Sequence, residues 1–363
     1  MTLLGTAAQP AQPLDPKVLP PKRRRGGSTS GTQRIAGWTF TAPAVIAIIV
    51  FVVVPVGMAL WVSLLKWNGL SSPFGGGAEF VGLDNYKRLL STDGLLRQNF
   101  TIGLRNNLYY VLMVVPGTIV LAFALALMVN QQRLKGRGFF RTVFYFPSIT
   151  SAVAITVTFL FLFQNSGVIN QVLGWFGISG PKWFVDSRGL FQTIAQALGI
   201  APASGTPMWG TGTILGLPIN QWLAGPSPAL IALATMTVWA SSGTFMLFFL
   251  AGLQNIPHEV DEAAFIDGAS TWQRFRFVTV PLMKKSLTLV ALLTVIGSWQ
   301  VFDSVYLATQ GGPQKTTLTP AFQSYQVSFK DGDFGGGAAI AFVLFLIIIV
   351  FTVGQRLISR EKD

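Results

Sequence analysis

The stretch "IPHEVDEAAFIDGASTWQRFRFVTVPLMKK", Ile256 to Lys285, is the most charge-dense run in the second half of the chain, and apolar sequence flanks it on both sides. Its acidic residues Glu259, Asp261 and Glu262 come first and its basic residues follow. Acidic side chains are stabilising near the N-terminus of a helix because the helix dipole is positive there. The stretch therefore predicts a short helical hairpin between two hydrophobic segments, and we call residues 256–285 the charged hairpin.

The charged hairpin carries its own start and stop signals. Pro257 suits the first position of a helix, and Gly268 suits a left-handed end to it. "STWQ", Ser270 to Gln273, is a capping-box pattern that starts a second helix. Pro281 is expected to limit that helix, because the residue before a proline is pushed away from helical geometry. Two short, angled helices suit a lever that docks on a partner, and an amphipathic loop on a membrane surface is the alternative.

The composition is that of a membrane protein. Of 363 residues, 51% are hydrophobic and 11% are charged, whereas a soluble domain has about 25% charged residues. The chain has no Cys, which excludes disulfides and thiolate metal sites, and its single His, His258, excludes a His-cluster metal site. A membrane enzyme would need convergent catalytic groups, which sparse acids and one His do not supply.

Uncharged runs predict an all-α membrane protein with six transmembrane helices, since a span needs roughly 20 mostly apolar residues. A seventh span near residues 190–223 is disfavoured by its prolines and glycines. Six spans place both termini on the same side of the membrane. The predicted spans are residues 38–65, 106–132, 142–163, 228–253, 286–308 and 334–355.

Lys and Arg give the expected orientation. They concentrate in the N-terminal tail, in residues 133–141, in the charged hairpin and at the C-terminus, which the positive-inside rule places in the cytoplasm. "KRRR", Lys22 to Arg25, resembles an RNA-binding patch in composition, but beside a first span it indicates a membrane flank, so no nucleic acid is expected. The expected organisation is a disordered basic cytoplasmic tail at 1–37, not a cleaved signal, and a transmembrane domain at 38–358 with an external loop at about 164–226 and a cytoplasmic loop at 255–285.

"EAAFIDGASTWQRFRFVTVPL", Glu262 to Leu282, resembles the signature cytoplasmic loop of binding-protein-dependent ABC transporter permeases. "FVGLDNYKRLL", "GRGFFRTVFYFP" and "FDSVYLATQGGP" resemble the maltose/trehalose-type sugar permeases, in the order of the first of the two permease subunits. The similarity covers roughly residues 38–355. By this resemblance the ATPase-coupling residues are Glu262, Ala263, Ala264, Asp267, Gly268, Ala269 and Pro281.

The resemblance implies a type I ABC importer permease in the cell membrane. Two permeases form the path, and partner ATPase subunits bind ATP and Mg and drive transport, so no cofactor is expected in this chain. "TQGGPQKTT" is not a phosphate loop, because Gln314 stands where a Gly must precede Lys315. An extracytoplasmic binding protein delivers the cargo, a disaccharide or oligosaccharide by resemblance. A glycerophosphodiester or another glycoside is the alternative cargo, and a secondary transporter or channel is the alternative class.

Residues for the substrate path are sought where polar groups enter the spans. Asp303 is an ionisable residue inside the fifth predicted span, and such residues usually face a bundle interior. Gln300, Asp303 and Tyr306 recur every three residues and are predicted to share one side of that span. Interhelical hydrogen bonding is the alternative role for such groups. The candidate path residues are Trp239, Thr244, Ser298, Trp299, Gln300, Asp303 and Tyr306.

The predicted external loop holds an insert at roughly 185–220, relative to the permeases that the chain resembles. Its position on the outer face favours contact with the binding protein. Its uncharged, Gly- and Pro-rich sequence equally permits packing on the membrane surface.

Overall fold

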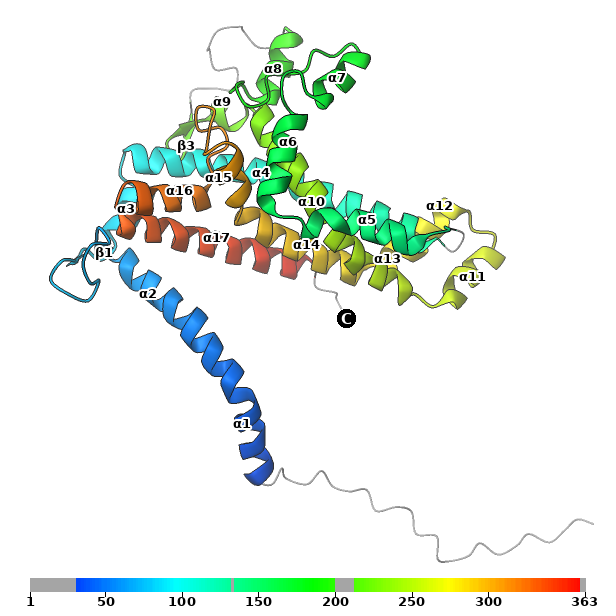
Figure 1. Ribbon diagram of the computed structural model, residues 1–363, viewed down its shortest axis with the longest axis horizontal. Coiled ribbons are helices and arrows are strands. Elements are labelled where there is room, and N and C mark those ends of the chain that lie inside the picture. The colour runs from blue at the N-terminus through cyan, green and yellow to red at the C-terminus, as the bar shows by residue number, and fades with distance from the viewer. Residues whose placement is uncertain (1–30, 132–133, 200–211, 360–363) are drawn as a thin grey trace, which may run out of the picture. The chain divides into compact units, whose positions relative to one another are not determined.

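The computed structural model describes residues 31–131, 134–199 and 212–359 (Figure 1). The chain separates at Gly57 into two parts that are considered one at a time. In the first part, α1 (Gly31–Ile48) continues through the π-helical turn η1 (Ile49–Val53) into α2 (Val54–Ser63), and the boundary between the parts falls within α2. Residues 31–37 of the predicted disordered tail are therefore helical, and the rest of that tail lies outside the described residues.

Four long helices build the second part. α4 (Leu95–Asn130) packs along both α10 (Pro228–Gln254) and α14 (Lys284–Trp299), and α14 also packs against α17 (Phe334–Ser359) (Figure 1). Their contact is made by buried apolar clusters, because apolar side chains that face one another across neighbouring helices exclude solvent and pack closely. One such cluster joins α4, α10 and α14.

The two ends of this bundle differ. α4 and α10 finish together, at Asn130 and Gln254, and the charged hairpin lies there, so we call this the hairpin end (Figure 1). The opposite end carries a two-stranded antiparallel sheet and several short helices. The hairpin comprises α11 (His258–Ile266), α12 (Thr271–Arg274), η2 (Phe275–Thr279) and α13 (Val280–Leu282); the opposite end has β1 (Leu65–Lys66), β2 (Glu79–Phe80), α3 (Asp84–Leu90), α16 (Pro320–Tyr325) and η3 (Gln326–Lys330).

Four of the described helices are long and apolar enough to cross a membrane, and the number rises to six if each of two bent helix pairs counts as one span. The third predicted span is one such pair: α5 (Arg137–Ile149) and α6 (Ala152–Leu162) meet at 97°. The second pair joins residues 271–282 to α14 at 65°. The third predicted span, residues 142–163, therefore corresponds to a sharply bent helix pair. The unbent candidate spans are Gly37–Ser63, Leu95–Asn130, Pro228–Gln254 and Phe334–Leu357.

The predicted insert is built of short elements. No helix between residues 164 and 226, outside the undescribed 200–211, is longer than eight residues, so those parts contain no seventh span. The elements are α7 (Val168–Trp175), α8 (Leu190–Ala197), β3 (Thr213–Ile214), β4 (Leu217–Pro218) and α9 (Ile219–Trp222).

Side chains one helical turn apart on α4 hold this insert by its backbone. Thr101 Oγ1 donates to the Leu215 carbonyl at 3.0 Å, and the Arg105 guanidinium donates to the Gln221 carbonyl at 3.2 Å. The Tyr109 hydroxyl donates to the carbonyl of Trp222. Because residues four apart share a helix face, one stripe of α4 fixes the β3–β4 hairpin and α9 to the opposite end of the bundle.

Candidate functional site

The turn of the charged hairpin is a Schellman motif centred on Gly268. The Ala269 N–H donates to the Ala264 carbonyl and the Gly268 N–H donates to the Phe265 carbonyl, both at 3.0 Å. Gly268 has φ +79°, a left-handed conformation that costs glycine nothing. The predicted left-handed end of the first helix is therefore confirmed, and Asp267 is the last residue before it.

The second half of the charged hairpin starts as predicted and ends differently. The Ser270 side chain accepts from the Gln273 N–H at 3.3 Å and the Gln273 side chain accepts from the Ser270 N–H at 2.7 Å, which confirms the capping box. Pro281 does not stop the helix: Val280 keeps φ −62° and ψ −45°, and the helix runs to Leu282. The Val280 N–H bonds to the Phe275 carbonyl five residues back, and this wider π turn moves the carbonyl ladder away from the proline ring.

The inner side of the charged hairpin is packed firmly onto the bundle. Phe275 and Met283 belong to a buried cluster with Phe123 of α4 and Phe249 of α10. The Phe123 ring centroid lies 5.2 Å from that of Phe249 and 6.0 Å from that of Phe275. A displacement of the hairpin therefore acts directly on the ends of α4 and α10, because close-packed interiors transmit strain.

The outer side of the charged hairpin is an apolar, exposed surface. Ile266 is 82% exposed and Trp272 is 66% exposed. Between the hairpin's two helices, Arg274 pairs with Asp261 at 2.8 Å and lies over the Phe265 ring at 5.6 Å, which holds them at a fixed angle. An exposed apolar patch on a rigid support is typical of a protein interaction site. We call it the hairpin crest: Phe265, Ile266, Trp272 and Phe277.

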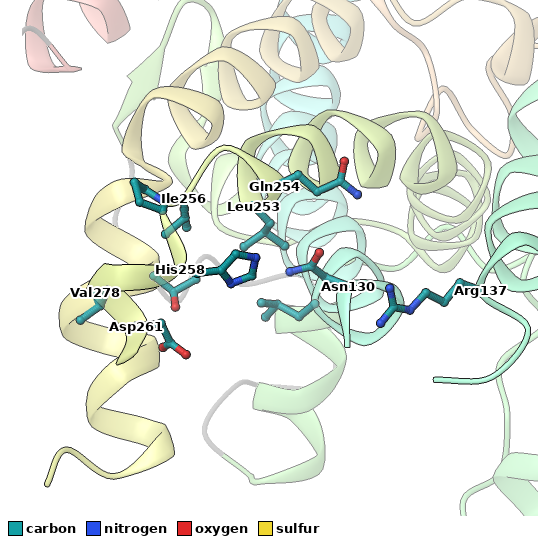
Figure 2. Close-up of a pocket in the computed structure, with 11 residues that line it drawn as sticks. Asn130, Arg137, Leu253, Gln254, Ile256, His258, Asp261 and Val278 are labelled. Carbon is teal, nitrogen blue, oxygen red and sulfur yellow. The ribbon is translucent and has the colours of Figure 1, made fainter. Parts of the chain in front are cut away.

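A polar pocket of about 500 Å³ lies at the root of the charged hairpin. Figure 2 shows Asn130 and Arg137 on one side of it and His258 and Asp261 on the other. Within the described part of the chain, the side chains of Asn130, Arg137 and His258 form no hydrogen bond or ion pair. The hairpin is therefore held to the bundle by its apolar inner side, while its polar root stays open.

The predicted coupling residues occupy distinct places in this hairpin. Ala264, Asp267, Gly268 and Ala269 build its turn, and Pro281 lies in its second helix. Glu262 and Ala263 are exposed on α11, and Glu262 makes no ion pair among the described residues. These two side chains are therefore available to a partner, whereas the others shape the surface that the partner meets.

A second candidate site lies on the side of the bundle, where two helices break. α5 ends at Ile149 and α6 begins at Ala152; α14 ends at Trp299 and α15 (Asp303–Ala308) begins four residues later. Both breaks open on one pocket of about 500 Å³. Non-helical backbone at membrane depth is tolerated where it lines a polar cavity, and broken helices form the substrate sites of many transporters.

We call this cavity the central pocket. Its apolar side chains include Ile155, Phe245 and Phe302, and its polar ones come from five elements. Ser148 of α5 fixes the wall: its hydroxyl donates to the Ala240 carbonyl at 2.6 Å and accepts from the Thr244 N–H at 3.0 Å. Gly243 permits this contact, because a Cβ there would lie 2.2 Å from the Phe144 carbonyl oxygen. The polar lining residues are Tyr110, Ser148, Thr150, Thr156, Thr237, Ser241, Thr244, Gln300, Asp303 and Ser304.

Three polar side chains of the central pocket are available to a polar ligand. The side chains of Thr244, Gln300 and Asp303 have no hydrogen-bond partner among the described residues. Asp303 is the only Asp, Glu, Lys or Arg that lines the pocket. Several hydroxyls, one amide and one carboxylate beside an aromatic ring suit a neutral ligand with many hydroxyl groups, because each polar group gains by pairing when water is displaced.

The structure separates the predicted path residues. Gln300, Asp303 and Tyr306 do not share one side of a continuous helix, because α14 ends at Trp299 and residues 300–302 are non-helical. Gln300, Asp303 and Thr244 nevertheless line the central pocket. The other four do not line it: Trp299 is 1% exposed and packs on Phe351, Ser298 is buried, Trp239 contacts Phe159, and Tyr306 belongs to an aromatic cluster with Phe302 and Tyr325.

Most of the polar lining residues were not among the predicted path residues. Ser148 and Thr150 follow Pro147 in "FPSIT", within an otherwise apolar run, and a proline-interrupted hydrophobic segment is a recognisable sign of a broken span. Tyr110 and Thr237 carry no such signal; they meet across α4 and α10 through a 2.6 Å hydrogen bond.

Apolar helices long enough to cross a membrane, a polar pocket at two helix breaks and an exposed hairpin packed on the helix ends together define a membrane transport protein of the permease class. Residues 107–363 match the family described as binding-protein-dependent transport system inner membrane component. The chain belongs to this family, so it is a transport component and not an enzyme.

Known relatives are similar in sequence to this protein along most of the chain. The lactose transport system permease protein of Rhizobium radiobacter is 31% identical over 331 residues, 90% of this chain and 95% of that protein. The trehalose/maltose transport system permease protein of Thermococcus litoralis is 29% identical over 326 residues, 90% of this chain and 94% of that protein. In a solved bacterial ABC transporter involved in the import of the acidic polysaccharide alginate, the matching chain has a TM-score of 0.65 at 17% identity, over 91% of this chain and 96% of that one. The predicted resemblance to sugar ABC transporter permeases is thereby confirmed.

Proposed function

We propose that this chain is one of two permease subunits of a type I ABC importer, and that it carries a neutral disaccharide or oligosaccharide across the cell membrane. Its partners in this proposal are a second permease, ATPase subunits that bind ATP and Mg, and an extracytoplasmic binding protein. No cofactor is assigned to this chain. The names of the lactose and trehalose/maltose relatives support the cargo class, and an alginate transporter has been solved with its oligosaccharide-bound periplasmic protein.

The central pocket carries the proposal for a neutral cargo. Its one lining carboxylate, Asp303, has no Lys or Arg beside it in the pocket. A glycerophosphodiester would place its phosphate charge near this carboxylate in a partly desolvated site, where like charges are strongly disfavoured. Sugar hydroxyls can instead donate to the carboxylate and to the Gln300 carbonyl oxygen. A neutral sugar is therefore preferred over the anionic alternative.

The charged hairpin carries the proposal for coupling. Its crest offers exposed apolar side chains to an ATPase subunit, its inner side contacts α4 and α10, and its open root leaves room for it to tilt. Both helices line the central pocket nearer the middle of the bundle. Closure of the ATPase subunits would thus bias an equilibrium between two bundle arrangements by acting on one rigid element.

Uptake into vesicles tests the function. The chain, its second permease, the ATPase and the binding protein are reconstituted together with radiolabelled maltose, trehalose or a glycerophosphodiester outside. We expect uptake of a disaccharide that requires both ATP and the binding protein. Uptake driven by an ion gradient without ATP would identify a secondary transporter, and uptake of the phosphodiester alone would overturn the proposed cargo.

Cysteine labelling tests the proposed orientation, with six spans and both termini in the cytoplasm. The chain has no Cys, so Ile266→Cys and Trp175→Cys each introduce a single thiol, at positions 82% and 81% exposed. With an impermeant maleimide, we expect Ile266→Cys to react only after the cells are opened and Trp175→Cys to react in intact cells. We also expect loaded binding protein to slow the reaction at position 175, because the insert lies at the opposite end of the bundle. The reverse labelling pattern would invert the orientation, and an unchanged rate at position 175 would reject docking there.

A further inference from the structure

Six aromatic rings follow one another from the opposite end of the bundle to the central pocket. We call them the aromatic track: Trp67, Phe334, Phe329, Tyr325, Tyr306 and Phe302. Successive ring centroids lie 5.2, 5.3, 5.3, 5.5 and 5.4 Å apart. The rings come from the segment after β1, from the start of α17, from η3 and α16, and from α15 and the break before it.

Each end of the aromatic track lies in a polar cavity. Phe302 lines the central pocket beside Gln300 and Asp303. Trp67 lines a pocket of about 730 Å³ at the opposite end, together with Lys66, Asn68, Glu79, Asp84, Arg88 and Asp333. The track is therefore the aromatic connection between two pockets with polar lining residues, one at the opposite end of the bundle and one at the two helix breaks.

Packing of the core accounts for one side of these rings only, because Phe302 and Tyr325 pack against the buried cluster that contains Phe322 while keeping exposed surface. Phe322 is fully buried behind the track, with centroids 6.1, 6.3 and 6.3 Å from Phe302, Tyr306 and Tyr325. The six rings in front of it all keep exposed surface, and Phe329 is 68% exposed. A residue that served only to fill the core would be covered as Phe322 is.

We propose that the aromatic track binds the apolar faces of pyranose rings and guides the sugar from the opposite-end pocket to the central pocket. This inference rests on the proposed sugar import. A pyranose presents C–H groups on its faces and hydroxyls at its edge, so it can stack on one aromatic ring after another while its hydroxyls stay in water. A cargo of this kind suits a polar cavity at each end and aromatic rings between them. The alternative is that a second permease subunit packs on these rings, and the experiment below distinguishes a bound sugar from a bound subunit.

The test replaces aromatic rings by aliphatic side chains of similar polarity. In the complete reconstituted transporter with saturating loaded binding protein, we expect Phe329→Leu to lower disaccharide uptake roughly twofold to tenfold, the range for one aromatic contact. ATP hydrolysis should fall less, so more ATP is used per sugar imported. The separate single variants Phe329→Tyr and Tyr325→Phe should retain normal uptake, because each keeps an aromatic face on which the sugar can stack. Phe345→Leu, at a 49% exposed ring on α17 that contacts only Phe342 among the described rings, is the matched control.

The outcomes separate the possibilities. Normal uptake by Phe329→Leu and by the double variant Phe329→Leu with Tyr325→Leu overturns the track while leaving sugar import intact. Loss of the second permease on co-purification of these variants also overturns it, since the rings then form a subunit interface. If the unmodified complex imports no sugar, the proposed function fails first, and it fails independently of any track variant.

Discussion

Gly268→Asp is expected to lower sugar uptake about tenfold or more while the complex continues to hydrolyse ATP. Gly268 has φ +79° in the Schellman turn between α11 and α12, and apart from its chain neighbours no described atom lies within 4 Å of the place where a Cβ would stand. Steric crowding is thus absent, and a left-handed conformation costs a side-chain-bearing residue about 1 kcal/mol or more. The new carboxylate adds a charge beside the hairpin crest, where an ATPase subunit is proposed to dock.

Two companion variants separate these effects. Gly268→Asn keeps the size of the side chain without its charge, and Asn tolerates the left-handed region, so we expect it to retain most uptake. Gly268→Val adds no charge but strains the turn, because β-branched residues strongly disfavour positive φ. The measurement is the number of ATP molecules hydrolysed per sugar imported. If Gly268→Asp and Gly268→Val both keep the normal number of ATP molecules hydrolysed per sugar imported, the turn at Gly268 does not contribute to coupling.

The charged hairpin was predictable because its signals are local. Gly268 needed only a helix before it, and Ser270 with Gln273 needed only the three-residue spacing of a capping box. The prediction that Pro281 limits the second helix was wrong, because a helix can also continue through a proline when a π turn precedes it. Pro55 shows the same solution in the first part of the chain: η1 precedes it at the same distance, and the Val54 N–H bonds to the Ile49 carbonyl five residues back.

The central pocket was less predictable because it depends on the directions in which the helices run and not on their composition. Residues 142–163 contain no charged residue, and their hydropathy gives no sign that α5 and α6 meet at 97°. The same limitation placed Gln300, Asp303 and Tyr306 on one helix, although Gln300 and Asp303 reach the pocket across a break. Only Thr244, Gln300 and Asp303 of the seven candidate path residues line the pocket, and their spacing along the sequence did not reveal the break between them.

Asp303→Asn is expected to reduce disaccharide uptake roughly ten- to hundredfold. Asp303 is an exposed carboxylate at the start of α15, lines the central pocket and has no partner among the described residues. Hydrogen bonds to a charged group contribute about 1.5–3 kcal/mol each, so losing one between the carboxylate and a sugar hydroxyl accounts for a change of this size. Steady-state uptake is measured with the complete transporter at saturating loaded binding protein.

A structural role for Asp303 predicts a different pattern. As an acid in the first turn of α15 it also stabilises that helix by about 0.3–1 kcal/mol, so the yield and melting temperature of the complex are recorded with uptake. Asp331→Asn, at an exposed acid outside the central pocket, is the matched control and is expected to transport normally. Uptake that is unchanged in Asp303→Asn would show that the carboxylate does not bind the cargo. Equal losses of uptake and of folded complex would assign Asp303 to the stability of the helix break, and the pocket's specificity would then rest on Gln300 and its hydroxyls.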